Sequence, residues 1–152
     1  MRMLATLLAI CAHVGAALAS AGSDELLEQS LVIGGIAIGD DETSVTAALG
    51  KPNQRTEAPD HFLPITLSYP GLVISLDEQG VGGILSTSKE FCTPANVCPG
   101  MTYAQVRETY GPSEPYERGG HIFRDYLWND GCWLRIEFEA EVATSIDATC
   151  SP

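Results

Sequence analysis

Residues 122–150, IFRDYLWNDGCWLRIEFEAEVATSIDATC, carry the clearest structural signal in the chain, because apolar and polar side chains alternate along most of their length. Alternation with a period of two is typical of strands that bury one face of a sheet. Turn residues interrupt the pattern twice, so it predicts three strands, over residues 122–128, 132–139 and 142–150. The dipeptide Asp130-Gly131 between the first two is a strong signal for a two-residue hairpin loop.

This hairpin loop determines which residues of the first two strands face each other. It predicts Leu127 opposite Leu134 and Phe123 opposite Phe138 on one buried, apolar face. The outer face then carries three cross-strand pairs, which are Trp128 with Trp133, Tyr126 with Arg135, and Arg124 with Glu137. Asp125 falls on the apolar face in this register, which indicates either a functional carboxylate or a bend in the strand.

The cysteines predict two disulfides. Cys11 lies in the N-terminal apolar run, and four cysteines follow it in the chain. A second hairpin, turning near Glu141, places Cys132 directly opposite Cys150, where the two can bridge. Cys92 and Cys98 then remain to staple a linker over residues 91–99. A zinc site is disfavoured because the chain has no CxxC pair with histidines nearby, and we expect no metal or other cofactor.

The N-terminus has the pattern of a secretory signal peptide. Arg2 supplies a positive charge, residues 4–18 form an uncharged apolar run, and Ala17-Leu18-Ala19 supplies small residues for cleavage. Cleavage after Ala19 removes residues 1–19 and leaves residues 20–35 as an N-terminal segment. The rest of the sequence contains no apolar run long enough to span a bilayer. We therefore expect a periplasmic or secreted protein without a membrane span.

The chain is strongly acidic. It contains 8 Lys and Arg against 20 Asp and Glu, a formal net charge of −12, and loss of Arg2 with the signal peptide changes −12 to −13. Nucleic acid is thereby a poor partner, because phosphate binding needs a basic face. The acidity favours either a cationic protein partner or simply solubility in a salty compartment.

Two stretches of the sequence predict short helices with the same kind of ends. In residues 100–112, Thr102 and Gln105 have the spacing of a capping box, and Gly111 followed by a proline predicts the end of the helix. In residues 39–52, Asp41 takes the place of Thr102 as the N-terminal cap. The two stretches therefore look like the openings of two related units.

Each predicted helix is followed by period-two segments, which predict three strands per unit. The first unit repeats the hairpin pattern around Pro70-Gly71, with Leu67 opposite Ile74 and Ile65 opposite Leu76. The expected fold class is thus α+β, a tandem repeat of two helix plus three-stranded antiparallel sheet units. The first α+β repeat covers residues 36–90 and the second covers residues 100–152.

The segment Gly100-Met101-Thr102, followed by Gln105-Val106 and Gly111-Pro112, resembles the opening motif of the SmpA/OmlA outer-membrane-assembly lipoproteins. Duplicated in one exported chain with two disulfides, the unit is similar to the BLIP-like family, named after the β-lactamase inhibitory protein. The resemblance implies two helix-and-sheet units side by side, over roughly residues 36–150, and binding of proteins without catalysis. No inhibitory contact residue of that family matches a position of this sequence, so the resemblance implies no particular target.

The sequence carries no recognisable catalytic apparatus. His61 and His121 lie far apart, and neither a GxSxG nor an HExxH motif is present. Carboxylates such as Asp125, Glu137 and Glu139 could pair as acid and base, but a chain this acidic produces such pairs by chance. We therefore expect a protein that is not an enzyme.

The predicted outer face of the last three strands is rich in the residue types that dominate binding hot spots. Its candidate binding residues are Arg124, Tyr126, Trp128, Trp133 and Arg135. The equivalent outer positions of the first unit are small or polar, namely Thr66, Ser68, Val73 and Ser75, so the fold does not require aromatic residues there.

These residues favour a non-enzymatic protein-binding module, either an inhibitor or an envelope accessory factor. Two alternatives remain open at the level of sequence. The pairs on the outer face can serve only to stabilise the sheet. The protein can instead bind carbohydrate or cell wall, with Trp128 and Trp133 stacking on sugar rings.

The signal-peptide interpretation predicts where the exported protein begins. Intact-mass measurement of the protein recovered from the exporting host should show an N-terminus at Ser20 or at Gly22. Retention of Cys11, with or without a lipid, would contradict this interpretation.

Overall fold

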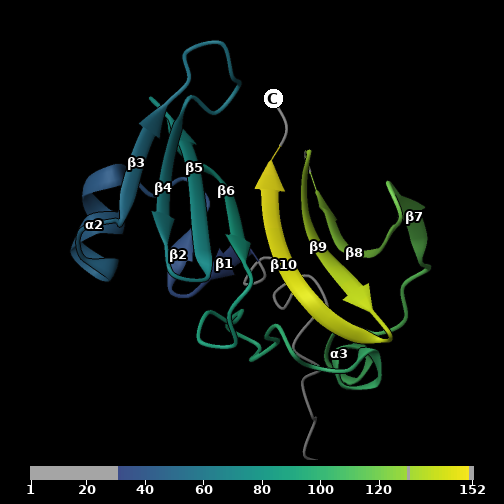
Figure 1. Cartoon of the computed structure of the whole chain (residues 1–152). Helices are drawn as coiled ribbons and strands as arrows, with labels where there is room; N and C mark the ends of the chain where they lie inside the picture. Colours follow the sequence, from purple (N-terminus) through teal and green to yellow (C-terminus); the bar gives the residue numbers. More distant parts are fainter. Residues whose placement is uncertain (1–30, 130, 151–152) are drawn as a thin grey trace, which may run out of the picture.

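The computed structural model describes residues 31–129 and 131–150. The first half contains β1 (Val32–Ile33), β2 (Ile36–Ala37), α2 (Glu42–Leu49), β3 (Gln54–Glu57), β4 (Ile65–Tyr69), β5 (Leu72–Asp77) and β6 (Gly80–Ser86). The second half contains α3 (Tyr103–Tyr110), β7 (Tyr116–Arg118), β8 (His121–Asn129), β9 (Cys132–Glu139) and β10 (Val142–Cys150). Strands β3 to β10 form one eight-stranded sheet in the order β3-β4-β5-β6-β10-β9-β8-β7, which Figure 1 shows from left to right.

The predicted tandem of two helix plus three-stranded units is wrong, because the sheet is continuous. β6 pairs with β10 in antiparallel register from Ser86 opposite Ile146 to Gly83 opposite Thr149. Two separate three-stranded sheets would leave these two strands as unpaired edges, whereas their pairing satisfies the backbone groups of both. The described part of the chain is therefore mostly β, with two helices of eight residues each.

The two strands at the outer edges of the sheet, β3 and β7, were not predicted. β3 consists of four exposed polar residues, which give no apolar alternation. Its Arg55 is held on the helix side by Glu42 of α2, with Nε 2.7 Å from Oε1, and also contacts Glu57 of its own strand. β7 has three residues, too few for a periodic pattern.

The predicted helix caps are confirmed. The side chain of Asp41 accepts a hydrogen bond from the backbone nitrogen of Ser44 at 2.6 Å, and this bond lowers the pKa of Asp41. Thr102 and Gln105 form the predicted capping box at the start of α3. Gly111 ends α3 with φ of 83°, a conformation in which a side chain would be strained.

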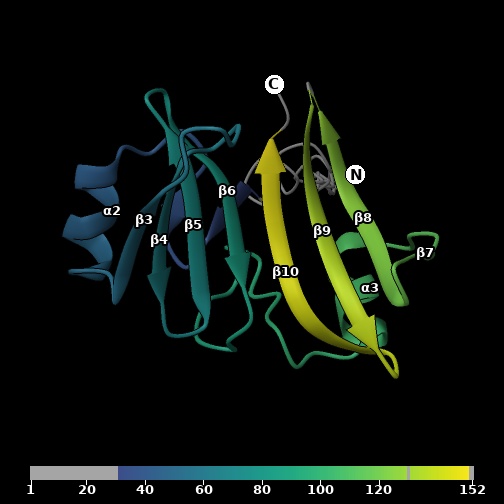
Figure 2. The ribbon, with the colours of Figure 1, turned by 45° about the horizontal axis from the view of Figure 1, so that its top comes forward.

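The hydrophobic core lies between one face of the sheet and the two helices. Val45 of α2 and Val106 of α3 are fully buried. They lie on the same side as the buried residues of the central strands, which are Ile74, Ile84, Leu134, Ile136, Ile146 and Ala148. Figure 2 shows α3 behind β8 and β9 and α2 beside β3, with β1 and β2 behind the first half of the sheet. The helices and the β1–β2 hairpin thus cover a single face.

Most of the predicted register is confirmed, but a β-bulge changes it in β8. Leu127 faces Leu134, as expected, whereas the register shifts between Asp125 and Leu127. Beyond this shift the predicted pairs are wrong: Phe123 faces Glu137, Arg124 faces Ile136, and Asp125 faces Arg135. Relative to the predicted register, the extra residue reverses the face to which the side chains on the N-terminal side of the bulge point. The bend that the sequence offered as one explanation of Asp125 is therefore present, and it removes this carboxylate from the apolar face.

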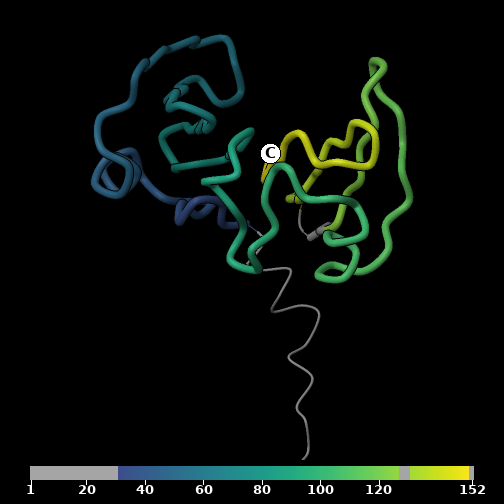
Figure 3. Tube along the Cα trace, turned by 60° about the horizontal axis from the view of Figure 1, so that its bottom comes forward, coloured from purple at the N-terminus to yellow at the C-terminus, as the bar shows by residue number. Residues whose placement is uncertain are grey.

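Both predicted disulfides are present. Cys92 is bonded to Cys98 in the connection between the halves, and Cys132 is bonded to Cys150 at the ends of β9 and β10. Figure 3 shows the two halves of the trace on either side, with this connection running between them. The signal peptide over residues 1–19 and most of the N-terminal segment, residues 20–35, lie outside the described residues. Within the described ranges, no helix has the length and apolar character that crossing a membrane requires.

A continuous sheet predicts that both halves unfold together. Ile84→Ala, at the β6–β10 junction, should lower the free energy of unfolding by about 2 to 5 kcal/mol, because it opens a cavity at a fully buried site. In urea titrations, tryptophan fluorescence from the second half and far-UV circular dichroism from both halves should share one midpoint. Leu85→Ala is the control, since Leu85 points to the opposite face and is 36% exposed. This substitution should lower the free energy of unfolding by less than Ile84→Ala does. Two separate transitions would contradict a single cooperative sheet.

Candidate functional site

The face of the sheet opposite the helices is the candidate functional site, and we call it the open face. Alternation along the central strands places the outward residues here, since their neighbours point into the core. These outward residues are Val73 and Ser75 of β5, Gly83 and Leu85 of β6, Asp147 and Thr149 of β10, and Trp133, Arg135 and Glu137 of β9. The bulge in β8 adds Phe123 and Asp125 to them.

Arg135 organises one half of the open face. Its guanidinium bonds both oxygens of Asp125, with Nε to Oδ1 at 2.9 Å and Nη2 to Oδ2 at 3.2 Å, and this contact raises the pKa of Arg135. The guanidinium also lies 5.3 to 5.9 Å from the centres of three aromatic rings, those of Tyr116, Phe123 and Trp133. We call these five residues the arginine cluster.

The edge strand β7 completes the arginine cluster. Its Tyr116 stacks on Phe123 with ring centres 5.7 Å apart and donates a hydrogen bond from its hydroxyl to Asp125 at 3.1 Å. Burial raises the pKa of Tyr116, so its hydroxyl remains a donor at neutral pH. The cluster is thus a preformed surface of aromatic rings around a neutralised guanidinium.

The middle of the open face is hollowed into a recess of about 180 Å³, which we call the central recess. Its walls are mainly apolar side chains, Leu63, Val73 and Leu85. Asp147 of β10 supplies a carboxylate, whose Oδ1 accepts a hydrogen bond from the hydroxyl of Thr149. Burial raises the pKa of Asp147, and the Thr149 hydrogen bond and Arg135 oppose this shift.

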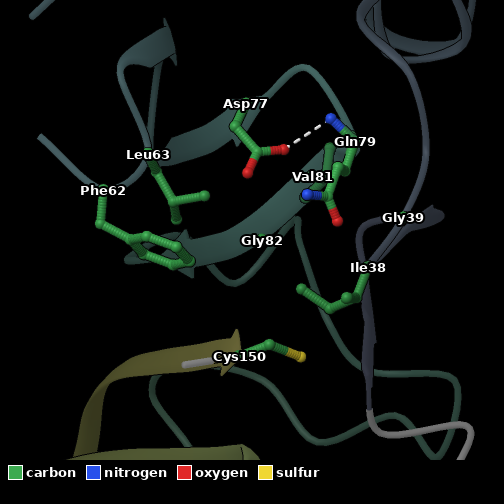
Figure 4. Close-up of a pocket in the computed structure, with 10 residues that line it drawn as sticks. Ile38, Gly39, Phe62, Leu63, Asp77, Gln79, Val81, Gly82 and Cys150 are labelled. Atoms are coloured by element: carbon green, nitrogen blue, oxygen red, sulfur yellow. Dashed lines mark hydrogen bonds between the residues drawn. The ribbon is translucent and has the colours of Figure 1, made fainter. Parts of the chain in front are cut away.

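One wall of the central recess comes from the loop between β3 and β4. Leu63 in this loop packs directly on β6: a Cβ on Gly82 would lie 2.6 Å from its Cδ2 atom. A side chain at position 82 would therefore displace the end of the Leu63 side chain. The adjacent Phe62 is 55% exposed, a large value for an aromatic residue. A second recess, of about 270 Å³, shares Leu63 with the central recess and lies between this loop, the β5–β6 turn and Cys150 (Figure 4).

The five residues predicted to bind do not all lie on the same face of the sheet. Trp133 and Arg135 lie on the open face, as expected. Arg124 is on the helix-covered face, where it is 8% exposed and lies 3.6 Å from the ring centre of Tyr103. Tyr126 is also on that side, with its ring centre 5.6 Å from that of Tyr110. The backbone of Trp128 pairs with Trp133, but its side chain lies outside the described residues.

The helix-side position of Tyr126 has a chemical consequence. Burial raises its pKa to about 12, and its hydroxyl is buried with no hydrogen-bond partner among the described residues. The indole nitrogen of Trp133 is in the same state. Arg124, by contrast, donates a hydrogen bond to the backbone oxygen of Ser113. The predicted outward position of Arg124 and Tyr126 is therefore wrong, and the bulge is the reason.

A third recess, of about 500 Å³, brings together a serine, a carboxylate and a histidine. Ser145 donates to Oε2 of Glu137 at 3.1 Å, and Nδ1 of His121 contacts Oε1 of the same carboxylate. In a nucleophilic site the serine bonds to the imidazole that takes its proton. Here the carboxylate separates the two. Within the described ranges, no group of three or more His, Cys, Asp or Glu is placed to hold a metal ion.

Several residues of the open face were missed by sequence reasoning. Asp147 could have been found, since it alternates with Ile146 and Ala148, which were placed on the buried face. Phe123 could not, because the bulge that turns it outward leaves no periodic signal. Tyr116 and Leu63 come from a short edge strand and a loop, whose positions depend on contacts distant in sequence.

Comparisons with known proteins place the fold without naming a family. No family model and no curated protein matches the chain. Among solved structures, it is similar to an extracellular protein containing a SCP domain from Bacillus anthracis, with a TM-score of 0.56 and 13% identity. It is also similar to a cysteine-rich secretory protein from Staphylococcus aureus, with a TM-score of 0.51 and 10% identity. Both matches cover 75% of this chain and 44% of the other chain.

A DUF4309 family protein from Bacillus subtilis matches with a TM-score of 0.49 and 15% identity, over 77% of this chain and 83% of that one. The two structures with TM-scores above 0.5 are not SmpA/OmlA lipoproteins or BLIP-like proteins, and the resemblance drawn from the sequence is wrong. The motif that suggested it consists mainly of helix-capping residues, Thr102, Gln105 and Gly111. Such residues serve any short helix with the same ends.

The position of Asp147 predicts an effect of pH on stability. Because its pKa is raised above 3.8, the ordinary value for an aspartate, Asp147 contributes to the free energy of unfolding in full below pH 3.8. This contribution is lost as the pH rises through the pKa of Asp147 in the folded state. Urea unfolding at several pH values between 3 and 7 should therefore show the native protein losing stability relative to Asp147→Asn as pH rises. Asp41→Asn is the control of opposite sign, because the pKa of Asp41 is lowered. If the native protein instead became more stable relative to Asp147→Asn as the pH rises, the attraction of Arg135 would affect the pKa of Asp147 more than burial does.

Proposed function

We propose that this chain is an exported, non-enzymatic module that binds a protein partner through the open face of its sheet. The observation that carries this proposal is the arginine cluster. It gathers three aromatic rings and one guanidinium on a face that neither helix covers. Aromatic and arginine side chains contribute most of the affinity in protein interfaces.

The rigidity of the arginine cluster supports this proposal. Arg135 is already fixed by two bonds to Asp125, and Tyr116 is fixed by stacking and by its hydroxyl. A partner therefore does not have to order these side chains when it binds, which lowers the entropic cost of association. The exposed ring of Phe62 adjoins Leu63, which lines the central recess.

Export is supported by two features. Two disulfides are typical of proteins outside the cytoplasm. Two of the similar solved structures are described as an extracellular and a secretory protein. A protein that acts outside the cytoplasm can reach partners in the periplasm or the medium, where its acidic charge keeps it soluble.

Binding of carbohydrate is the alternative from the sequence, and it depends on open indole faces. The guanidinium of Arg135 lies 5.3 Å from the ring centre of Trp133 and so occupies one face of that indole. The indole nitrogen of Trp133 is also buried, so it offers no hydrogen bond to a sugar hydroxyl. The covered indole face and the buried indole nitrogen favour a protein partner over a sugar.

The proposal is tested by comparing a variant that disrupts the arginine cluster with a variant of an exposed arginine elsewhere on the protein. The partner is first isolated from extracts of the native host on the immobilised protein, and its affinity is then measured with purified components. Tyr116→Ala combined with Arg135→Ala should weaken binding at least about a hundredfold, as expected for two hot-spot residues. Arg107→Ala is the matched control, because Arg107 is exposed on α3, away from the open face.

Three outcomes would contradict the proposal. The first is equal affinity of the double variant and the native protein. The second is loss of binding in Arg107→Ala. The third is binding to purified cell-wall fragments that excess soluble oligosaccharide displaces, which would favour the carbohydrate alternative. Circular dichroism of each variant establishes that the sheet is intact.

A further inference from the structure

We propose that the central recess receives a lysine side chain of the partner protein, an inference that rests on the proposed function and deepens it. A lysine has an unbranched apolar stem that ends in a compact charge with three donors. The central recess offers the matching surfaces in the same order, apolar walls around a carboxylate. It therefore identifies the class of partner as a protein with an exposed lysine on its binding surface.

The dimensions of the recess suit this occupant. Its volume is about 180 Å³, and an apolar cavity of about 150 Å³ is large enough to hold benzene. Leu63, Val73 and Leu85 form walls along which the methylene groups of a lysine can pack. Leu85 is itself 36% exposed, so the occupant would cover apolar surface that is now in contact with water.

The hydrogen bonds of Asp147 favour lysine over arginine. Its Oδ1 atom already accepts a bond from Thr149, and Oδ2 receives no hydrogen bond from any residue that the structure describes. An arginine binds a carboxylate best when its fork reaches both oxygens. A single open oxygen instead suits the point charge of an ammonium group.

The charges around the recess also favour a cation. Three charged groups determine the field at Asp147, which are Asp147 itself, Arg135 and Asp125. The guanidinium of Arg135 is bonded to both oxygens of Asp125, so it only partly offsets the charge of Asp147. A partly desolvated carboxylate without a bonded counter-ion is costly, and an incoming ammonium group lowers that cost.

The net charge of the chain disfavours a second copy as the occupant of the recess. Two chains of formal charge −12 repel each other. A cationic partner is instead attracted by the whole molecule as well as by the recess, which speeds their encounter at low salt.

The test uses n-butylammonium as a probe, because it reproduces the end of a lysine side chain without the rest of a partner. The ¹⁵N-labelled protein, recovered from the exporting host with both disulfides formed, is titrated at pH 7 and its amide shifts are recorded. We expect shifts that saturate and are largest at Val73, Gly83, Leu85, Asp147 and Thr149. n-Butanol has the same stem without the charge and should bind at least about tenfold more weakly, since it lacks a charge-assisted hydrogen bond.

Two variants assign the effect to one carboxylate. Asp147→Asn should weaken n-butylammonium at least about tenfold, whereas Glu108→Gln, which changes an exposed carboxylate on α3 away from the open face, should retain binding. If Asp147→Asn does not fold, the comparison of n-butylammonium with n-butanol in the native protein is decisive by itself. Equal shifts with the two probes, or shifts centred away from the recess, would overturn the inference. In that case the effect of Tyr116→Ala with Arg135→Ala on partner affinity still tests the proposed function independently.

Discussion

The backbone pairing of β6 with β10 is the contact on which the rest of the structure depends. It joins strands from the two halves along four residue pairs, from Ser86 with Ile146 to Gly83 with Thr149. On one face this pairing brings Ile84 and Ala148 together in the core. On the other face it places Leu85 beside Asp147 and so creates the central recess. The core and the candidate site are therefore two sides of the same junction.

Local features of the fold could be predicted because their causes are local. Alternation gave the strands that became β9 and β10 with correct bounds, and opposed positions gave the bridge between Cys132 and Cys150. Capping residues gave both helices. The β6–β10 pairing could not be predicted, since its residues lie far apart in the chain and nothing in either segment specifies the other. The error in fold class and the mistaken family resemblance both follow from treating each half as complete.

The candidate site was predicted only in part, and one residue explains most of the difference. Tyr126 is the extra residue of the bulge in β8, and it moves Arg124 to the helix side and Phe123 to the open face. The sequence did contain a sign of this, since an unbroken register would have buried the carboxylate of Asp125. Instead, Asp125 holds Arg135 on the open face. Trp133 and Arg135 were placed correctly because they lie on β9, whose alternation is unbroken.

The order of the strands has a further consequence for how the protein folds as it emerges during synthesis. β10 follows every other strand of the sheet in the sequence, yet it occupies the middle of the sheet. Until β10 arrives, β6 and β9 are both open edges, and open edges are where chains pair wrongly with one another. The sheet closes through contacts of long sequence separation, which slows folding. The interval before β10 docks is therefore the period of greatest aggregation risk, and a chaperone that protects this protein would need to shield β6 and β9.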